Sequence, residues 1–292
     1  MAGNKDRQRR IARERHRRQQ EARQIRRQQV RRRTIEWASI IAGLGLVLGL
    51  VLAFALPGSS KPATAQSTAT HTSSPTPTAS PTPTVVEPAT HCSYTAAPAA
   101  QVAKKETFPP ATPDYTTVSY LATIHTNLGP IKITLLNSKA TCTVSSFVHL
   151  AQAGYFNNTQ CHRMVTSGIY VLQCGDAFAT ASTKLTCSSS SKVGSGGPGY
   201  QYANENTTGA SYVTGTVAMA NAGGATNGSQ FFIVFKDSTS LPANYTPFGT
   251  VSSGLNIVQN VAKDGLSCTF GTAGDGAPKQ KVIIDSVTIQ KT

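Results

Sequence analysis

One stretch of the sequence decides the fold: Val217-Ala-Met-Ala-Asn-Ala-Gly-Gly-Ala-Thr-Asn-Gly-Ser-Gln-Phe-Phe-Ile233. It begins as a short apolar strand, continues through small residues, Gly and Asn, and returns to a strand that opens with Gln230 and two Phe residues. Small side chains let the backbone of a ligand approach closely, and Phe232 can form the floor of an apolar pocket. The stretch therefore predicts two strands beside a ligand-binding surface.

The residues around this stretch show the pattern of many short strands separated by turn residues. Two amphipathic helices are predicted, at residues 144–155 and 255–262. Strands are expected at residues 120–126, 131–136, 168–174, 211–219, 230–235, 248–251 and 281–290. Many short strands with only two helices predict a mainly β fold, a closed antiparallel barrel.

Arg163 is the only arginine after residue 33, and every other cation of the globular part is a lysine. The planar guanidinium presents a fixed fork of donors that lysine cannot reproduce. A single arginine in the run Cys161-His-Arg-Met-Val165 is therefore a candidate functional residue. The alternative is an ordinary surface salt bridge, which the neighbouring motifs disfavour.

The motifs of several enzyme classes are absent from the sequence. There is no Gly-x-Ser-x-Gly elbow, phosphate loop, HExxH pair or dinucleotide fingerprint. Acidic residues are sparse in the globular part, and no cysteine pair has the CxxC spacing of a zinc site. Hydrolysis and group transfer have little support, and we predict neither a metal site nor a cofactor.

Taken together, four segments resemble the cyclophilin family of peptidyl-prolyl cis-trans isomerases. They are the opening stretch, His162-Arg163, Gly194–Tyr200 and Phe248–Val251, and the resemblance covers residues 118–292. It implies an eight-stranded closed antiparallel barrel with two capping helices. It also implies an enzyme that accelerates rotation about X-Pro bonds in proline-containing polypeptides, without covalent chemistry.

The resemblance also assigns site residues. The catalytic residues it implies are Arg163, Gln173 and Asn221, and the substrate-binding residues are Tyr170, Val171, Ala220, Ala222, Gln230, Phe232, Leu241 and Tyr245. His162 is expected to be structural, because neighbours on a strand face opposite sides and isomerisation needs no proton transfer. The segment between Arg163 and Gln173 is longer than in common family members. This departure favours the alternative function, a membrane-tethered proline-peptide-binding or chaperone module with weak turnover.

The N-terminus is strongly basic and is followed by an apolar run. Residues 1–33 contain fourteen Lys/Arg and three Asp/Glu, a net charge of +11, whereas the whole chain carries +14. We predict a basic cytoplasmic tail at residues 1–34 and a transmembrane helix at 35–56, since about 20 apolar residues cross a bilayer and basic flanks stay in the cytoplasm. Ala53-Phe-Ala55 leaves a cleaved signal peptide as an alternative. Nucleic acid is not an expected partner, because arginines beside a span more often set topology or contact lipid.

Residues 57–116 are rich in Pro, Ser, Thr and Ala. Such a composition cannot bury enough apolar surface to fold, so we predict a disordered, extended linker there and an isomerase domain at residues 117–292. The predicted localisation is the cell membrane, as a single-pass protein whose isomerase domain lies outside the cytoplasm.

All six cysteines follow the apolar run: Cys92, Cys142, Cys161, Cys174, Cys187 and Cys268. An even number on one side of a membrane span is typical of disulfides formed in an oxidising compartment. Six cysteines allow 15 pairings, and free buried thiols are the alternative.

Overall fold

The computed structural model describes residues 91–113, 118–188 and 191–292. The predicted transmembrane helix and the first part of the predicted linker lie outside these residues. Among the helices that are described, none has both the length and the apolar character required to cross a bilayer.

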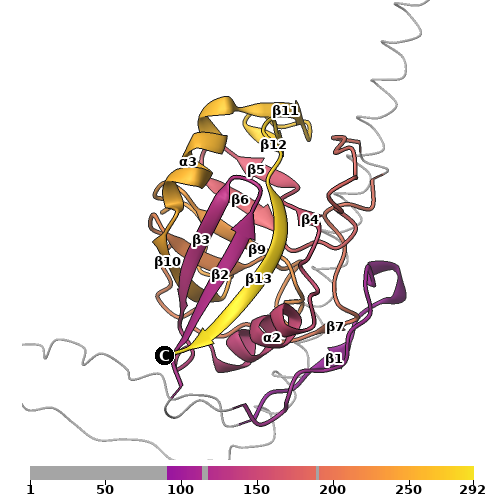
Figure 1. Ribbon diagram of the computed structural model, residues 1–292, viewed down its shortest axis with the longest axis vertical. Helices are drawn as coiled ribbons and strands as arrows, with labels where there is room; N and C mark the ends of the chain where they lie inside the picture. The colour runs from indigo at the N-terminus through magenta and orange to yellow at the C-terminus, as the bar shows by residue number, and fades with distance from the viewer. Residues whose placement is uncertain (1–90, 114–117, 189–190) are drawn as a thin grey trace, which may run out of the picture. The chain divides into compact units, whose positions relative to one another are not determined.

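The fold is mainly β, as predicted, and almost all of its strands belong to one antiparallel sheet. The sheet strands are β2 (Tyr120–Thr126), β3 (Gly129–Leu135), β4 (Thr159–Gln160), β5 (Arg163–Val165), β6 (Val171–Cys174), β8 (Thr216–Met219), β9 (Phe231–Val234), β10 (Pro247–Ser253), β11 (Leu266–Thr269), β12 (Asp275–Pro278) and β13 (Ile283–Lys291). They follow the spatial order β11-β12-β5-β6-β9-β8-β10-β3-β2-β13-β4 (Figure 1). The two outermost strands of this order, β11 and β4, do not pair with each other within the described residues.

Every strand and both amphipathic helices predicted after residue 117 are present, with shifted bounds. The strands that the sequence analysis missed, such as β4, β5 and β12, have two to four residues each. A periodicity of two cannot be recognised over so few positions, so their pairing depends on the longer strands beside them.

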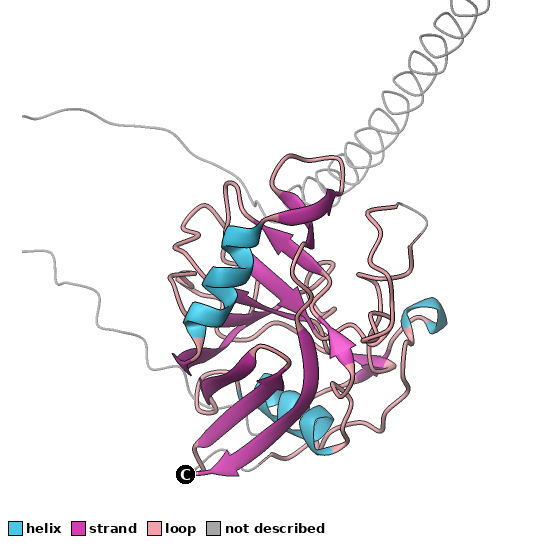
Figure 2. Cartoon of the chain, turned by 45° about the horizontal axis from the view of Figure 1, so that its top comes forward, coloured by secondary structure: helices cyan, strands magenta, loops and turns pink. Residues whose placement is uncertain are grey.

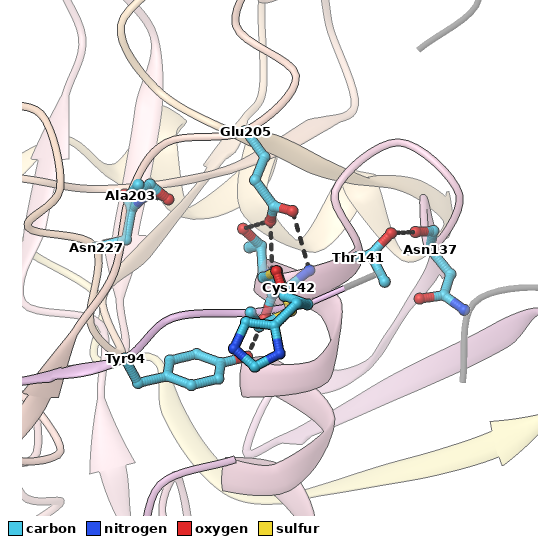
Figure 3. Close-up of a disulfide and its surroundings, with 10 residues drawn as sticks. Tyr94, Asn137, Thr141, Cys142, Ala203, Glu205 and Asn227 are labelled. Atoms are coloured by element: carbon cyan, nitrogen blue, oxygen red, sulfur yellow. Dashed lines mark hydrogen bonds between the residues drawn. A yellow bond between two sulfur atoms is a disulfide. The ribbon is translucent and has the colours of Figure 1, made fainter. Parts of the chain in front are cut away.

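Two α-helices, α2 (Thr141–Gln152) and α3 (Leu255–Asp264), lie separately outside the strands (Figure 2). The apolar face of α2 is buried against the main core, in which the rings of Phe147, Phe156, Phe231 and Phe248 contact one another. The sequence pattern placed the start of α2 too late, because its capping group is distant in sequence. The Glu205 carboxylate accepts hydrogen bonds from the backbone N–H of Cys142 at 3.0 Å and of Thr143 at 2.7 Å (Figure 3).

Residues 92–106, which we call the N-terminal arm, pack against the rest of the described domain although they fall within the predicted linker. The arm contains β1 (Thr95–Ala96), which pairs with β7 (Tyr200–Gln201), and a 3-10 helix, η1 (Ala99–Gln101). The assignment of residues 92–106 to a disordered linker is therefore wrong, because specific contacts supply the stability that their composition lacks.

Three disulfides account for all six cysteines, and none of them is free. Cys92 joins the N-terminal arm to Cys142 of α2, and Cys161 joins the chain before β5 to Cys174 of β6. The third bridge connects Cys187 to Cys268 of β11. The alternative of free buried thiols is excluded.

Candidate active site

Four polar side chains from four strand regions form a continuous hydrogen-bonded row. Arg163 of β5 lies opposite Gln173 of β6 in the strand register and donates from Nη1 to its Oε1 at 3.1 Å. Gln173 Nε2 in turn donates to Gln230 Oε1 at 2.8 Å. At the other end, Asp275 of β12 accepts from Arg163 Nε and Nη2, both at 2.8 Å. We call Asp275, Arg163, Gln173 and Gln230 the polar row.

The row fixes the guanidinium without using all of its donors. Arginine has five N–H groups, and the contacts to Asp275 and Gln173 use three of them. No further acceptor within the described residues contacts Arg163, whose side chain is 38% exposed. The hydrogen bonds that Arg163 donates to Asp275 raise the pKa of Arg163 above its already high ordinary value, against the opposing effect of burial. The site therefore presents a permanent cation with two N–H groups open to a ligand.

A cluster of apolar side chains lies next to the polar row. Phe232 of β9 is 4% exposed and is the partner of both Gln173 and Ala218 in the strand register. Its ring lies 5.6 Å from that of Tyr245, edge to face. We call this cluster the apolar pocket, after the role proposed for it below, and its residues are Val165, Ile169, Val171, Ala210, Tyr212, Ala218, Ala220, Phe232, Val234, Leu241 and Tyr245. Five predicted site residues, Val171, Ala220, Phe232, Leu241 and Tyr245, thus come together.

The remaining predicted residues form the rim. Gln230 is held from the other side, because its Nε2 donates to the carbonyls of Gly194 at 3.1 Å and Gly196 at 3.0 Å. The amide side chain of Asn221 is engaged by neighbouring loops and donates to Asn244 O at 2.9 Å. Ala222 is exposed and donates its N–H to the Thr226 hydroxyl. The side chain of Asn221 is therefore held by contacts within the rim.

The structure places Tyr170 outside the apolar pocket. Its ring packs edge to face on Phe235 at 6.0 Å, and the Lys236 ammonium lies 4.5 Å from its centroid. The neighbouring Ile169 packs into the pocket in its place. The assignment of Tyr170 to substrate binding is thus not supported: successive residues face opposite sides of a strand, so Val171 and Ile169 face the apolar pocket whereas Tyr170 packs against the main core.

The match to known protein families settles the family. Residues 121–289, more than half of the 292 residues, match the family described as cyclophilin type peptidyl-prolyl cis-trans isomerase/CLD. This chain is a cyclophilin. The polar row and the apolar pocket both lie within the residues that carry the match.

Relatives of this cyclophilin are found in mycobacteria. It is 44% identical over 178 residues to a Mycobacterium tuberculosis protein named "Probable peptidyl-prolyl cis-trans isomerase B", which covers 56% of this chain and 52% of the relative. A Mycobacterium leprae protein of the same name is 40% identical over 217 residues, or 68% of this chain and 66% of the relative. The chain thus spans about half to two thirds of these relatives. A solved cyclophilin type isomerase of Cryptosporidium parvum is 23% identical, with a TM-score of 0.48 over 60% of this chain and 99% of the other.

Some residues of the cyclophilin site escaped the sequence analysis. Asp275, which fixes Arg163 from 112 positions away, stands in a glycine-rich turn without any local pattern. Tyr212 is buried beneath Phe232, donates its hydroxyl to Tyr245 O at 2.8 Å and accepts from Tyr245 N at 3.0 Å. Only the strand pairing brings these residues to the site, so a single sequence holds no signal for them.

His162 has the structural character expected for it. Its side chain is 2% exposed, and neither ring nitrogen has a hydrogen-bond partner among the described residues. Burial lowers the pKa of His162 to about 4, and the charge of Asp176 opposes this shift. The imidazole is therefore neutral at pH 7.

Proposed function

We propose that this cyclophilin is a peptidyl-prolyl cis-trans isomerase, which accelerates X-Pro bond rotation in exported proteins. The observation that carries the proposal is an oriented guanidinium with two open N–H groups beside an apolar pocket floored by Phe232. A proline ring is an apolar group of the right kind for that pocket, and a peptide nitrogen next to it is within reach of the rim.

The mechanism follows from the physics of the amide. Rotation about X-Pro faces a barrier of about 18–20 kcal/mol because the C–N bond has partial double-bond character. In the twisted amide the prolyl nitrogen regains a lone pair, which Arg163 can bind by a charge-assisted hydrogen bond. This bond is absent in both planar forms, so it lowers the barrier rather than the ground state. Each gain of about 1.4 kcal/mol accelerates rotation about tenfold.

The other residues hold the two halves of the substrate differently. The apolar pocket binds the proline ring, while Gln173 and the backbone at Asn221 hold the peptide beside it. No bond is broken, so the chemistry requires no nucleophile, proton donor or metal. Asp275 keeps the guanidinium in one orientation, which spares the enzyme reorganisation during the rotation.

The binding-module alternative rested on the longer segment between Arg163 and Gln173. These residues remain direct register partners, as do Val165 and Val171, and the additional length falls in the turn at 166–170. The departure therefore leaves the geometry of the polar row intact, which favours the enzyme.

A protease-coupled assay on an X-Pro peptide tests the proposal. The purified full chain should accelerate isomerisation, and Arg163→Ala should lower kcat/KM at least tenfold while the circular dichroism spectrum stays unchanged. Lys279→Ala removes an exposed cation as a matched control and should retain full activity. A wild-type rate equal to that of buffer would leave only the binding-module function, to be measured by peptide titration.

We also infer that the sheet closes into the eight-stranded barrel. Support comes from residues 159–165, in which β4 pairs with β13 and β5 pairs with β6. Cys161 N donates to Val282 O at 2.9 Å and His162 N donates to Gln173 O at 3.0 Å between these two ladders. If residues 159–165 are counted as one strand, this strand pairs with β13 along one edge and with β6 along the other. The backbone amides of Cys161 and His162 should then show strong hydrogen-exchange protection.

We further propose that residues 35–56 anchor the protein in the cell membrane, with residues 1–34 in the cytoplasm and the isomerase domain outside. Support comes from the uncharged run after a basic tail and from three disulfides after residue 91, which are typical of an oxidising compartment. Protease added to intact cells should digest the isomerase domain. Alkaline extraction should leave the chain in the membrane fraction. Release by alkali, or protection until lysis, would contradict this topology.

A further inference from the structure

The N-terminal arm is attached to the domain at several points. The Cys92–Cys142 disulfide ties it to the start of α2, where the Tyr94 hydroxyl also donates to Cys142 O at 3.0 Å (Figure 3). The Tyr94 ring packs edge to face on Tyr200 at 5.6 Å and on Tyr202 at 5.5 Å. These contacts hold the arm in one position along β7 (Figure 1).

Beyond β1, the arm pairs with the loop that supports the polar row. Gly197 N donates to Gln101 O at 2.7 Å, and Ala103 N donates to Gly197 O at 3.0 Å. The fit is tight, because a Cβ atom on Gly196 would lie 2.9 Å from that of Ala103. Gly196 is also an acceptor for Gln230. The arm thus reaches the catalytic surface through a single intervening loop.

A surface hollow of about 210 Å³ lies where the arm, this loop and the polar row meet. Ala97 and Gln101 of the arm line it on one side, and Gln173, Ala220, Asn221 and Gln230 line it on the other. Ala220 also packs against the apolar pocket, and Gln173 is the register partner of Phe232. The hollow therefore adjoins the apolar pocket at Ala220 and Gln173.

The chemistry of the hollow is selective. Among the described residues that line it, none is an Asp, Glu, Lys, Arg or His; they are Ala, Gly, Gln, Asn, Ser, Thr and Tyr. A charged side chain placed there would lose hydration without gaining a counter-charge, which is unfavourable. Small apolar or amide side chains would lose little hydration free energy. Amide side chains could also form hydrogen bonds with the Gln and Asn side chains that line the hollow.

We propose that the N-terminal arm forms the outer wall of a second substrate subsite, in which Gln101 selects an uncharged side chain on a residue flanking the isomerising proline. This inference rests on the proposed isomerase function. It makes the arm, which a disulfide fixes in place, a determinant of substrate specificity rather than a spacer.

Charge substitution in the arm tests the proposal. The variants Gln101→Lys and Gln101→Glu are compared on proline peptides that carry Ala, Lys or Glu at each position from two before to two after the proline. At one of these positions wild type should prefer Ala. At that same position, the ratio of kcat/KM for the Glu peptide to that for the Lys peptide should be at least fivefold higher in Gln101→Lys than in Gln101→Glu.

Ala100 provides the matched control, because it is exposed on the same 3-10 helix but does not line the hollow. Ala100→Lys and Ala100→Glu should change the ratio less than twofold. An unchanged ratio in the Gln101 variants, or an equal change in the Ala100 variants, would overturn the inference while activity on the Ala peptides still supports the isomerase. Inactivity of wild type on every peptide would instead refute the proposed function.

Discussion

Arg163 and Val165 lie two residues apart on β5, and Gln173 and Val171 lie two apart on β6, so all four face the same side of the sheet. Arg163 and Gln173 belong to the polar row, whereas Val165 and Val171 belong to the apolar pocket. The polar row is held by directional hydrogen bonds of 2.8 to 3.1 Å between charged and amide groups. The pocket is held by burial of apolar surface and by ring contacts, which tolerate small displacements.

This difference separates two contributions to catalysis. The polar row can distinguish a twisted amide from a planar one, because a hydrogen bond depends on the position of a lone pair. The apolar pocket binds the proline ring equally well in every state of the peptide. Substitutions in the row should therefore lower kcat, whereas substitutions in the pocket should raise KM.

Among the substitutions that distinguish the polar row from the apolar pocket, the largest effect on turnover is expected at Asp275. Asp275→Asn removes the carboxylate that fixes Arg163, and a hydrogen bond to a charged group contributes about 1.5–3 kcal/mol. We expect kcat to fall about tenfold with KM changed less than twofold. Asp264→Asn, at the end of α3, removes a carboxylate that is not part of the row and should match wild type in steady-state kinetics.

A smaller effect is expected in the pocket. Phe232→Leu keeps an apolar side chain but loses the ring that contacts Tyr245, and we expect KM to rise about threefold to tenfold at constant kcat. Phe231→Leu is the matched control, because Phe231 is buried in the main core on the opposite face of β9. Both variants should lose about 1–2 kcal/mol of unfolding free energy, but a rise in KM for Phe231→Leu would show that the two faces are not separate.

The sequence predicted those site residues that stand in a recognisable motif. It did not predict those that only strand pairing brings to the site. Arg163, Gln173 and Phe232 stand in recognisable runs, and the structure brings them together. Tyr170 was assigned by counting back from Gln173, but Val171 faces the pocket and its neighbour Tyr170 therefore faces the main core. Asp275 gave no signal because its role depends on the ladder between β12 and β5.

The fold shows the same limit. The long strands and both helices follow from periodicity, but the N-terminal arm has the composition of a linker. Its order depends on one disulfide, one two-residue strand and a set of tyrosine contacts with distant residues. The presence of Cys92 in that segment was the only local indication that it is fastened to the domain, and pairing it with Cys142 requires the structure.

The smallest effect on turnover is expected from His162, although it should control stability. Its folded-state pKa of about 4 lies below the ordinary 6.5, so the folded state binds a proton less readily than the unfolded chain. Its contribution to stability is complete above pH 6.5 and is lost as the pH falls through 4, on the order of 3 kcal/mol. Urea unfolding at pH 7 and pH 4.5 should show this loss in wild type and a smaller one in His162→Asn.

Turnover provides the control for that experiment. Because His162 takes no part in the reaction, kcat should be the same at pH 6 and pH 8, where Arg163 keeps its charge. A kcat that changes with pH as an imidazole titrates would contradict this prediction, because protonation of His162 would then affect the reaction.

The central claim is that the planar fork of Arg163, and not its charge alone, stabilises the twisted amide. Arg163→Lys keeps the positive charge but cannot bind Asp275 and Gln173 while also donating to a prolyl nitrogen. The direct measurement is NMR exchange between the cis and trans forms of a saturating X-Pro peptide, with wild type and Arg163→Lys. The account predicts that the catalysed exchange rate falls at least tenfold in the lysine variant while peptide affinity changes less than threefold; exchange as fast as in wild type would contradict it.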